Sequence, residues 1–377
     1  MNPIDYYSNL QSKMSHFLKQ MVETESPSHN KEAVDRMGSI ILEQLKKLKA
    51  DIFIDKQDKT GDNILGQWNK DDNQMGILLL SHMDTVFPLG TLSNFPCREE
   101  SGNLHGPGAL DMKAGIEILL TCLESLQDLG KFPHKPINAL FTSDEETGSH
   151  QSRPLIERLA RKSDLVLCLE PAMPNGALKT WRKGVGNYKI TAYGRAAHAG
   201  NDHINGRNAI EEIAHQILVI QQFTDYQKGT TVNVGVIHGG TVSNVVPENA
   251  YAYVDVRVMN EEETNRIAQQ MMSLKPVLKE TRLEIKGGLN RPPMPFDSLM
   301  ATTFTKAQQI AMKIGIQLKA GGSGGGSDAN FIAPIGIPVL DGLGALGRGM
   351  HSKDEYVILK SLPERAALLA AILTEWY

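Results

Sequence analysis

The sequence has little of what marks several protein classes. It holds three cysteines in 377 residues, and Cys97, Cys122 and Cys168 form no CxxC pair and cannot all be joined in disulfides. Its longest apolar runs, such as 77–80 and 165–169, are far shorter than the roughly 20 residues that a membrane helix needs. Lys plus Arg (39) and Asp plus Glu (43) nearly balance, at a net charge of -4. The composition therefore gives no electrostatic basis for binding nucleic acid or an anionic membrane.

The first 22 residues lack a basic segment followed by an apolar one, so no secretory signal is expected, and their spacing predicts an amphipathic helix. Hydrophobic residues (41%) and charged residues (22%) are near the globular average, which excludes wholesale disorder. A chain of 377 residues suits two domains of roughly 100–200 residues each. With Cys122 and Cys168 in apolar surroundings, we expect a cytoplasmic protein whose thiols stay reduced.

The first half of the chain predicts a largely parallel sheet. Short, continuously apolar segments alternate with helical patterns, as in strands that are buried on both faces. The strands are expected at 76–80, 137–143, 165–170 and 337–344, and the helices at 30–50, 113–129 and 154–161. The fold class is therefore α/β, a mostly parallel sheet covered by helices.

After Trp181 the strands mix apolar and polar residues, as in a sheet with one solvated face. The order strand, helix, strand, strand, helix, strand is that of a ferredoxin-like α+β unit. Its strands are expected at 185–194, 230–238, 250–258 and 281–286, and its helices at 207–222 and 261–272. We predict one α/β domain formed by residues 1–180 and 293–377, with the smaller domain, residues 181–292, inserted into it.

Four of the predicted parallel strands lead into side chains that can bind metal ions. These are His82 and Asp84 after the first strand, Asp144, Glu145 and Glu146 after the second, Glu170 at the end of the third, and His351 beyond the fourth; Asp111 precedes a helix. Because the carboxyl ends of parallel strands share one edge of a sheet, these side chains can converge there.

Two imidazoles (His82, His351) and three carboxylates (Asp111, Glu146, Glu170) can hold two divalent ions if one carboxylate bridges them. Nitrogen and oxygen ligands without thiolate favour zinc, with cobalt or manganese as substitutes.

Two further carboxylates have an expected use at such a site. Asp84 can accept the second ring N–H of His82, and the remaining Glu145 can act as a general base. Each feature alone can also be explained without a metal ion. The sequence DEE (144–146) is common in solvated turns, and Asp111 can cap a helix. Only the joint pattern, in which every strand end carries such residues, favours a metal site.

Six motifs occur in a characteristic order: HMDTV (82–86), GPGALDMKAG (106–115), SDEETGS (143–149), CLEPA (168–172), AAHAG (196–200) and GMHSKDEY (349–356). Together they resemble the di-zinc aminoacylase/carboxypeptidase family of metallopeptidases over essentially the whole chain. The sequence GPG before Asp111, and Glu at position 170, resemble the bacterial glutamate carboxypeptidase branch of that family, the folate-hydrolysing type.

The resemblance implies a set of roles. The implied ligands of the two zinc ions are His82, Asp111, Glu146, Glu170 and His351, with Asp111 bridging. Asp84 is implied as the orienting carboxylate and Glu145 as the base. A cis peptide bond between Asp111 and Met112 is also implied.

For the inserted domain, the resemblance implies that His198 reaches the active site of a partner subunit, which requires a homodimer. Asn244 and Arg257 match positions that bind the carboxylate of the substrate, and Gly325 and Gly326 match a loop whose backbone donates to it. Without the resemblance, His198 would be a loop histidine and Arg257 a solvent-facing strand residue. The glycine-rich segment 321–328 is either an ordered, ligand-facing turn or a flexible loop.

The expected activity is zinc-dependent hydrolysis of an amide bond next to a free carboxylate. It would release a C-terminal amino acid such as glutamate from a small acyl- or peptidyl-amino acid. The same residues would suit an N-acyl amino acid deacylase. An inactive metal- or peptide-binding relative is the third alternative, although such a protein needs no general base.

Overall fold

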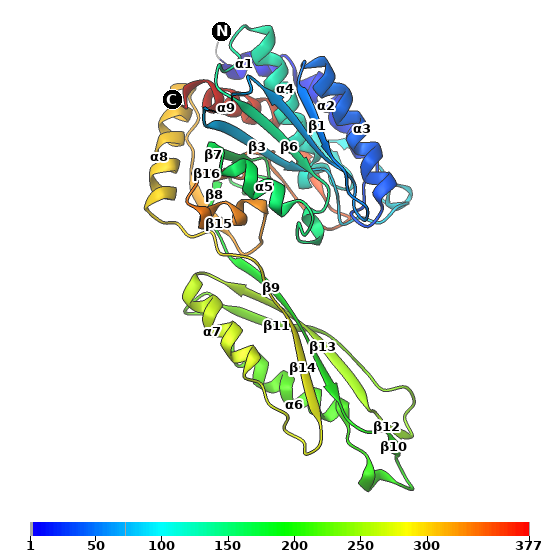
Figure 1. The fold of residues 1–377 in the computed structure, drawn as a ribbon. Helices are drawn as coiled ribbons and strands as arrows, with labels where there is room; N and C mark the ends of the chain where they lie inside the picture. Colours follow the sequence, from blue (N-terminus) through cyan, green and yellow to red (C-terminus); the bar gives the residue numbers. More distant parts are fainter. Residues whose placement is uncertain (1–2, 72, 377) are drawn as a thin grey trace. The chain divides into compact units, whose positions relative to one another are not determined.

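The computed structural model describes residues 3–71 and 73–376, and the chain divides into two compact units (Figure 1). The first comprises Met1–Trp181, Phe296–Gly322 and Ser327–Tyr377, and the second comprises Arg182–Pro295 and Ser323–Gly326. The sequence had suggested boundaries at 180/181 and 292/293. The structure differs mainly in that four residues of the glycine-rich segment belong to the second unit.

An eight-stranded sheet forms the centre of the first unit. Its order is β1 (Asp51–Asp55), β2 (Asn63–Trp68), β6 (Ile137–Thr142), β3 (Gly76–His82), β7 (Ser163–Cys168), β16 (Val339–Asp341), β8 (Leu178–Arg182) and β15 (Ala320–Ser323). The four strands expected from their apolar runs, β6, β3, β7 and β16, are mutually parallel and central. The predicted α/β class is confirmed. The antiparallel strands β1 and β2, at one side of this sheet, were not predicted.

Helices cover this sheet (Figure 1): α1 (Pro3–Ser8), α2 (Gln11–Val22), α3 (Lys31–Lys47), α4 (Ala114–Asp128), α5 (Arg153–Ala160), α8 (Ser298–Lys313) and α9 (Ser361–Glu375). All except α5 contribute side chains to one large core that also includes Ile77 and Leu79 of β3. The N-terminal segment, expected to be one helix, is two, because Asn9 and Leu10 interrupt it. Among the described residues, no helix has both the length and the apolar character needed to cross a membrane.

The second unit has the predicted ferredoxin-like order. Its elements are β9 (Gly184–Tyr193), α6 (Ala209–Gln221), β11 (Thr231–Gly239), β13 (Asn249–Val258), α7 (Glu261–Met272) and β14 (Arg282–Arg291). The four strands form an antiparallel sheet in the order β11-β13-β9-β14. Residues of α6 and α7 share a core with alternate residues of β9 and β13, so one face of the sheet is covered. A short ribbon of β10 (Ala197–His198) and β12 (Val245–Val246) extends from this unit.

A small antiparallel sheet in the first unit was not predicted. It contains β17 (Gly347–Arg348), β18 (Tyr356–Ile358), β5 (Asn103–His105) and β4 (Arg98–Glu100). Tyr356 pairs with His105 across it. The pairing brings the segment that follows β5, which carries Asp111, next to the segment that precedes β18, which carries His351.

Candidate functional site

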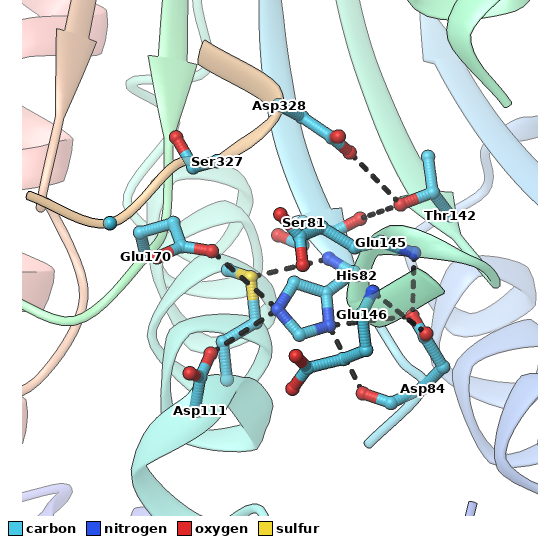
Figure 2. A network of polar contacts seen from close by, with 12 residues as sticks. Ser81, His82, Asp84, Asp111, Thr142, Glu145, Glu146, Glu170, Ser327 and Asp328 are labelled. Atoms are coloured by element: carbon cyan, nitrogen blue, oxygen red, sulfur yellow. Dashed lines mark hydrogen bonds and ion pairs between the residues drawn. The ribbon is translucent and has the colours of Figure 1, made fainter. Parts of the chain in front are cut away.

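His82 is at the centre of a group of ionisable side chains at the carboxyl end of β3 (Figure 2). Every residue of β3 is buried, and its neighbours β6 and β7 run parallel to it, so the three strands end at the same edge of the sheet. The Nε2 atom of His82 lies 3.3 Å from Oδ1 of Asp111 and 3.6 Å from Oε1 of Glu170. Three of the predicted ligands therefore meet at one point.

His351 forms the second half of this group. Its Nε2 atom lies 3.3 Å from Oδ2 of Asp111 and 3.3 Å from Oε2 of Glu146. The two oxygen atoms of Asp111 thus face two different histidines, and each histidine also faces a carboxylate of its own. This is the arrangement expected of a carboxylate shared by two positive ions.

The electrostatics of the cluster also favour cations. Burial raises the pKa of Glu146 to about 7, and contacts with Asp111 and Glu146 raise the pKa of His351 to about 11. Burial alone would raise the pKa of Asp111 too, but hydrogen bonds from His351 and His82 hold it well below its usual range. Three crowded carboxylates and two imidazoles, without thiolate, form a donor set that fits divalent ions of the zinc type.

Asp84 contacts the ring of His82 mainly through its backbone carbonyl, whereas the sequence suggested a contact through its carboxylate. The Nδ1 atom of His82 donates to the backbone carbonyl oxygen of Asp84 at 3.0 Å, whereas the nearest carboxylate oxygen lies at 3.4 Å. The carboxylate instead accepts the backbone N–H groups of Glu145 and Glu146, each at 3.2 Å, and the hydroxyl of Ser28 at 2.7 Å. Asp84, which is fully buried, therefore positions both His82 and the turn that carries two of the candidate residues.

Glu145 lies close enough to act on a ligand of this cluster. A carboxylate oxygen of Glu145, a ring nitrogen of His82 and a carboxylate oxygen of Glu170 all lie within 4.8 Å of one another. Glu145 is partly exposed, whereas His82 and Glu170 are buried. Its place at the accessible side of the cluster suits a group that exchanges protons with a bound water molecule.

Two residues at the cluster were not assigned from the sequence. Lys179 in β8 is buried, and its Nζ atom lies 3.6 Å from Oε2 of Glu170. Glu355 is fully buried and accepts the backbone N–H of Asp111 at 3.0 Å. The only sequence signal for Glu355 was its place four residues after His351 in the GMHSKDEY motif.

The peptide bond between Asp111 and Met112 is cis, which confirms the cis bond that the family resemblance implied.

Residues predicted to bind the substrate lie in the second unit, in two separate places. His198 pairs with Val245 between β10 and β12, and the carbonyl of the neighbouring Asn244 accepts the N–H of Ala199 at 2.9 Å. Arg257 lies near the other end of β13, eight residues beyond Asn249, which corresponds to about 27 Å along a strand. Within one chain, Asn244 therefore lies beside His198 and far from Arg257.

His198 is exposed, and its tautomer follows from its contacts. The N–H groups of Gly200 and Asn201 donate to its Nδ1 atom at 3.1 and 3.0 Å. Because Nδ1 accepts these bonds, the proton of the neutral ring is on Nε2, which can donate to a ligand.

Arg257 is held by a neighbour in its own strand. Its Nε and Nη2 atoms donate to the two carboxylate oxygens of Asp255, both at 2.9 Å, and Nη1 donates to the carbonyl of Gly324 at 3.4 Å. Gly324 belongs to the glycine-rich segment 321–328. Two further carbonyls of this segment, those of Gly325 and Gly326, accept from Nη1 of Arg182 at 3.1 and 2.9 Å. The glycine-rich segment is therefore ordered by two arginines of the second unit.

The N–H of Gly325, expected to face a ligand, donates to Oγ of Ser323 at 3.0 Å. Ser327 ends the segment as the N-cap of a short 3₁₀ helix, Asp328–Phe331.

Comparison with known proteins decides the family. Residues 78–375 match the sequence profile of peptidase family M20/M25/M40. The chain belongs to this family. It is 30% identical over 368 residues to carboxypeptidase G2 of Pseudomonas sp. (strain RS-16), covering 95% of this chain and 88% of that protein. It is 28% identical over 335 residues to a succinyl-diaminopimelate desuccinylase of Acinetobacter baylyi, covering 83% and 87% of the two chains.

Solved structures of peptidases share the fold. An aminopeptidase PepT from Bacillus cereus superposes with a TM-score of 0.78 at 24% identity, over 97% of this chain and 98% of that one. An M20 family metallo-carboxypeptidase, Sso-CP2, from Sulfolobus solfataricus superposes with a TM-score of 0.77 at 16% identity, over 96% and 98%. The resemblance to a metallopeptidase family seen in the motifs is confirmed, and the chain is an M20 metallopeptidase, a hydrolase of amide bonds that uses divalent metal ions.

Proposed function

We propose that this M20 metallopeptidase is a di-zinc hydrolase that cleaves the amide bond next to a free carboxylate. Its products would be a C-terminal amino acid such as glutamate and the acyl or peptidyl remainder. The observation that carries the proposal is the geometry of Asp111, whose two oxygens face His82 and His351 at 3.3 Å each. A carboxylate placed in this way suits a pair of ions rather than one.

The ions would be held by His82, Asp111 and Glu170 on one side and by His351, Asp111 and Glu146 on the other. Two divalent ions supply Lewis acidity, which polarises a carbonyl group and lowers the pKa of a bound water molecule. Zinc is proposed because the donors are imidazole and carboxylate groups, and cobalt or manganese would be substitutes.

The side chains would then carry the protons. Glu145 would take a proton from the attacking water and deliver it to the leaving amine, as a general base followed by a general acid. The Nε2–H of His198 would donate a hydrogen bond to the oxygen that becomes negative at the reacting carbon. Asp84 would keep the ring of His82 and the turn of Glu145 in place throughout.

The free carboxylate of the substrate would be bound by Arg257, whose orientation is fixed by Asp255, together with Gly326 and Asn244. Gly325 would join them if its N–H exchanged the bond to Oγ of Ser323 for one to the substrate. Because Asn244 lies beside His198 and far from Arg257, we assign Asn244 and His198 to the site of the partner subunit in a homodimer.

An exposed edge strand of the second unit supports the homodimer. Strand β11 is at an edge of its sheet, and its residues Val236 and Ile237 are exposed by 44% and 49%. An exposed apolar edge strand can be covered by a second copy of the chain. A cytoplasmic location is a separate part of the proposal, supported by the three cysteines, which form no disulfide bond: Cys97, Cys122 and Cys168.

The test is a comparison of substrates with zinc-loaded protein. Acyl-glutamates and short peptides that end in glutamate should be hydrolysed faster than N-acetyl or N-succinyl derivatives of other amino acids, and a chelator should abolish turnover until zinc is restored. A preference for the N-acetyl or N-succinyl substrates would support the deacylase alternative, in line with the similar desuccinylase. Absence of turnover on all of them would contradict the proposal.

A further inference from the structure

Glu355 binds the backbone of the segment that carries Asp111. The Oε1 atom of Glu355 accepts the N–H groups of Leu110 at 2.7 Å and of Asp111 at 3.0 Å, and Oε2 accepts the N–H of Gly108 at 3.1 Å. Glu355 has no exposed surface. One buried carboxylate therefore satisfies three of the four backbone donors of residues 108–111, and the fourth, the N–H of Ala109, donates to the carbonyl of Gly106 at 3.2 Å.

The backbone of residues 108–111 has a conformation that presents several N–H groups to one carboxylate. Gly108 has a φ of +69°, and a Cβ atom there would lie 2.5 Å from Cγ2 of Thr85, so only glycine fits. In this left-handed turn, the N–H groups of residues 108, 110 and 111 all point to one side, where a single anion can accept them. Glu355 occupies the position of that anion.

The same residue connects both halves of the proposed metal centre. Glu355 comes four residues after His351, and its backbone carbonyl accepts the N–H of Gly106 at 3.3 Å. Side chain and backbone of Glu355 thus join the segment of His351 to the segment of Asp111. The 3.3 Å approach of His351 Nε2 to Asp111 Oδ2 is made between the two segments that Glu355 links.

We propose that Glu355 is a positioning residue, which sets Asp111 between the two ions before any ion binds. It acts on the metal site through the backbone of residues 108–111. The inference rests on the proposed function, because it takes Asp111 to be the bridging ligand. Loss of a group that orients a metal ligand typically lowers metal affinity or activity by roughly 10–100-fold.

Two variants separate positioning from other roles. In Glu355→Gln, the amide oxygen can still accept from Leu110 and Asp111, but the NH₂ group faces the N–H of Gly108 and that bond is lost. Glu355→Ala removes all three bonds. Glu364→Gln, which removes the same charge from an exposed position of α9, is the control.

The experiment measures zinc affinity of the native chain and the variants by competition with a chelating dye, together with kcat and KM at saturating zinc. We expect affinity to fall about tenfold in Glu355→Gln and about 100-fold in Glu355→Ala. The value of kcat should fall in the same order, KM should stay within about twofold because Arg257 is untouched, and Glu364→Gln should resemble the native chain.

Hydrogen exchange of the native chain without metal gives a second reading, independent of how the variants fold. The amides of Gly108, Leu110 and Asp111 should be protected even in the absence of zinc. Unprotected amides, or zinc affinity in Glu355→Gln and Glu355→Ala within twofold of native, would overturn the positioning role while leaving the proposed function in place. A native chain that binds no zinc would overturn the proposed function and the positioning role with it.

Discussion

Replacing Arg257 by glutamine should remove the preference for a free carboxylate. Asp255 occupies the Nε and Nη2 edge of the guanidinium at 2.9 Å, and the carbonyl of Gly324 accepts from Nη1 at 3.4 Å, so a substrate can use only the remaining N–H groups of Nη1 and Nη2. One charge-assisted hydrogen bond is worth about 1.5–3 kcal/mol, which corresponds to about 10–100-fold in kcat/KM. The loss should therefore lie in that range, well below what removal of a catalytic group would cause.

The assay compares an acyl-glutamate with the same compound carrying an α-carboxamide, using the native chain and Arg257→Gln. The native enzyme should prefer the free acid, and the variant should hydrolyse both at the slower rate. Arg282→Gln, an exposed arginine on β14 of the same sheet, is the matched control and should keep the native preference. If Arg257→Gln slows both compounds equally, or neither, Arg257 does not recognise the carboxylate.

Three further predictions concern other parts of the molecule. Glu145→Gln should lower kcat by about 10²–10⁴-fold while zinc content, measured on the same sample, stays native; activity within a few-fold of native would exclude Glu145 as the base. Chains with His198→Ala, mixed and refolded with Glu145→Gln chains, should regain activity that neither variant has alone, since one site of each hybrid dimer is intact; no recovery would contradict a site shared between subunits. Burial raises the pKa of Glu117 to about 8, and its Oε2 atom has no hydrogen-bond partner among the described residues. The folded state therefore binds more protons than the unfolded state between about pH 4.5 and 8, and stability falls as pH rises through that window. Glu117→Gln should remove the contribution of Glu117 to this slope, so that in denaturant titrations the variant loses about 2–4 kcal/mol less free energy of unfolding than the native chain between pH 5 and pH 8; parallel pH profiles of the two chains would refute it.

The central strands and the larger helices were predictable because their signals are local. A continuously apolar run such as 76–80 can only be buried on both faces, and this identified the parallel strands whose ends carry His82 and Glu170. Their convergence followed from a general property of parallel sheets, without knowledge of distances. The small sheet of β4, β5, β17 and β18 was missed because strands of two or three residues have no measurable periodicity.

Contacts to the backbone were the part of the site that the sequence could not show. Asp84 was expected to contact the ring of His82 through its carboxylate. One carboxylate oxygen lies 3.4 Å from Nδ1, but the shorter contact, at 3.0 Å, is with the carbonyl, and the carboxylate also accepts the N–H groups of Glu145 and Glu146. Glu355 likewise acts on the backbone. Because any residue offers an N–H group, no sequence pattern marks such a partner. The spatial separation of Asn244 from Arg257 also required the strand register of the second unit.

The most direct test of the central claim is anomalous diffraction at the zinc edge from crystals of the zinc-loaded protein. The account predicts two peaks per chain with Asp111 between them, one beside His82 and Glu170 and the other beside His351 and Glu146. A single peak, no peak at this edge of the sheet, or two peaks that do not share Asp111 would contradict it.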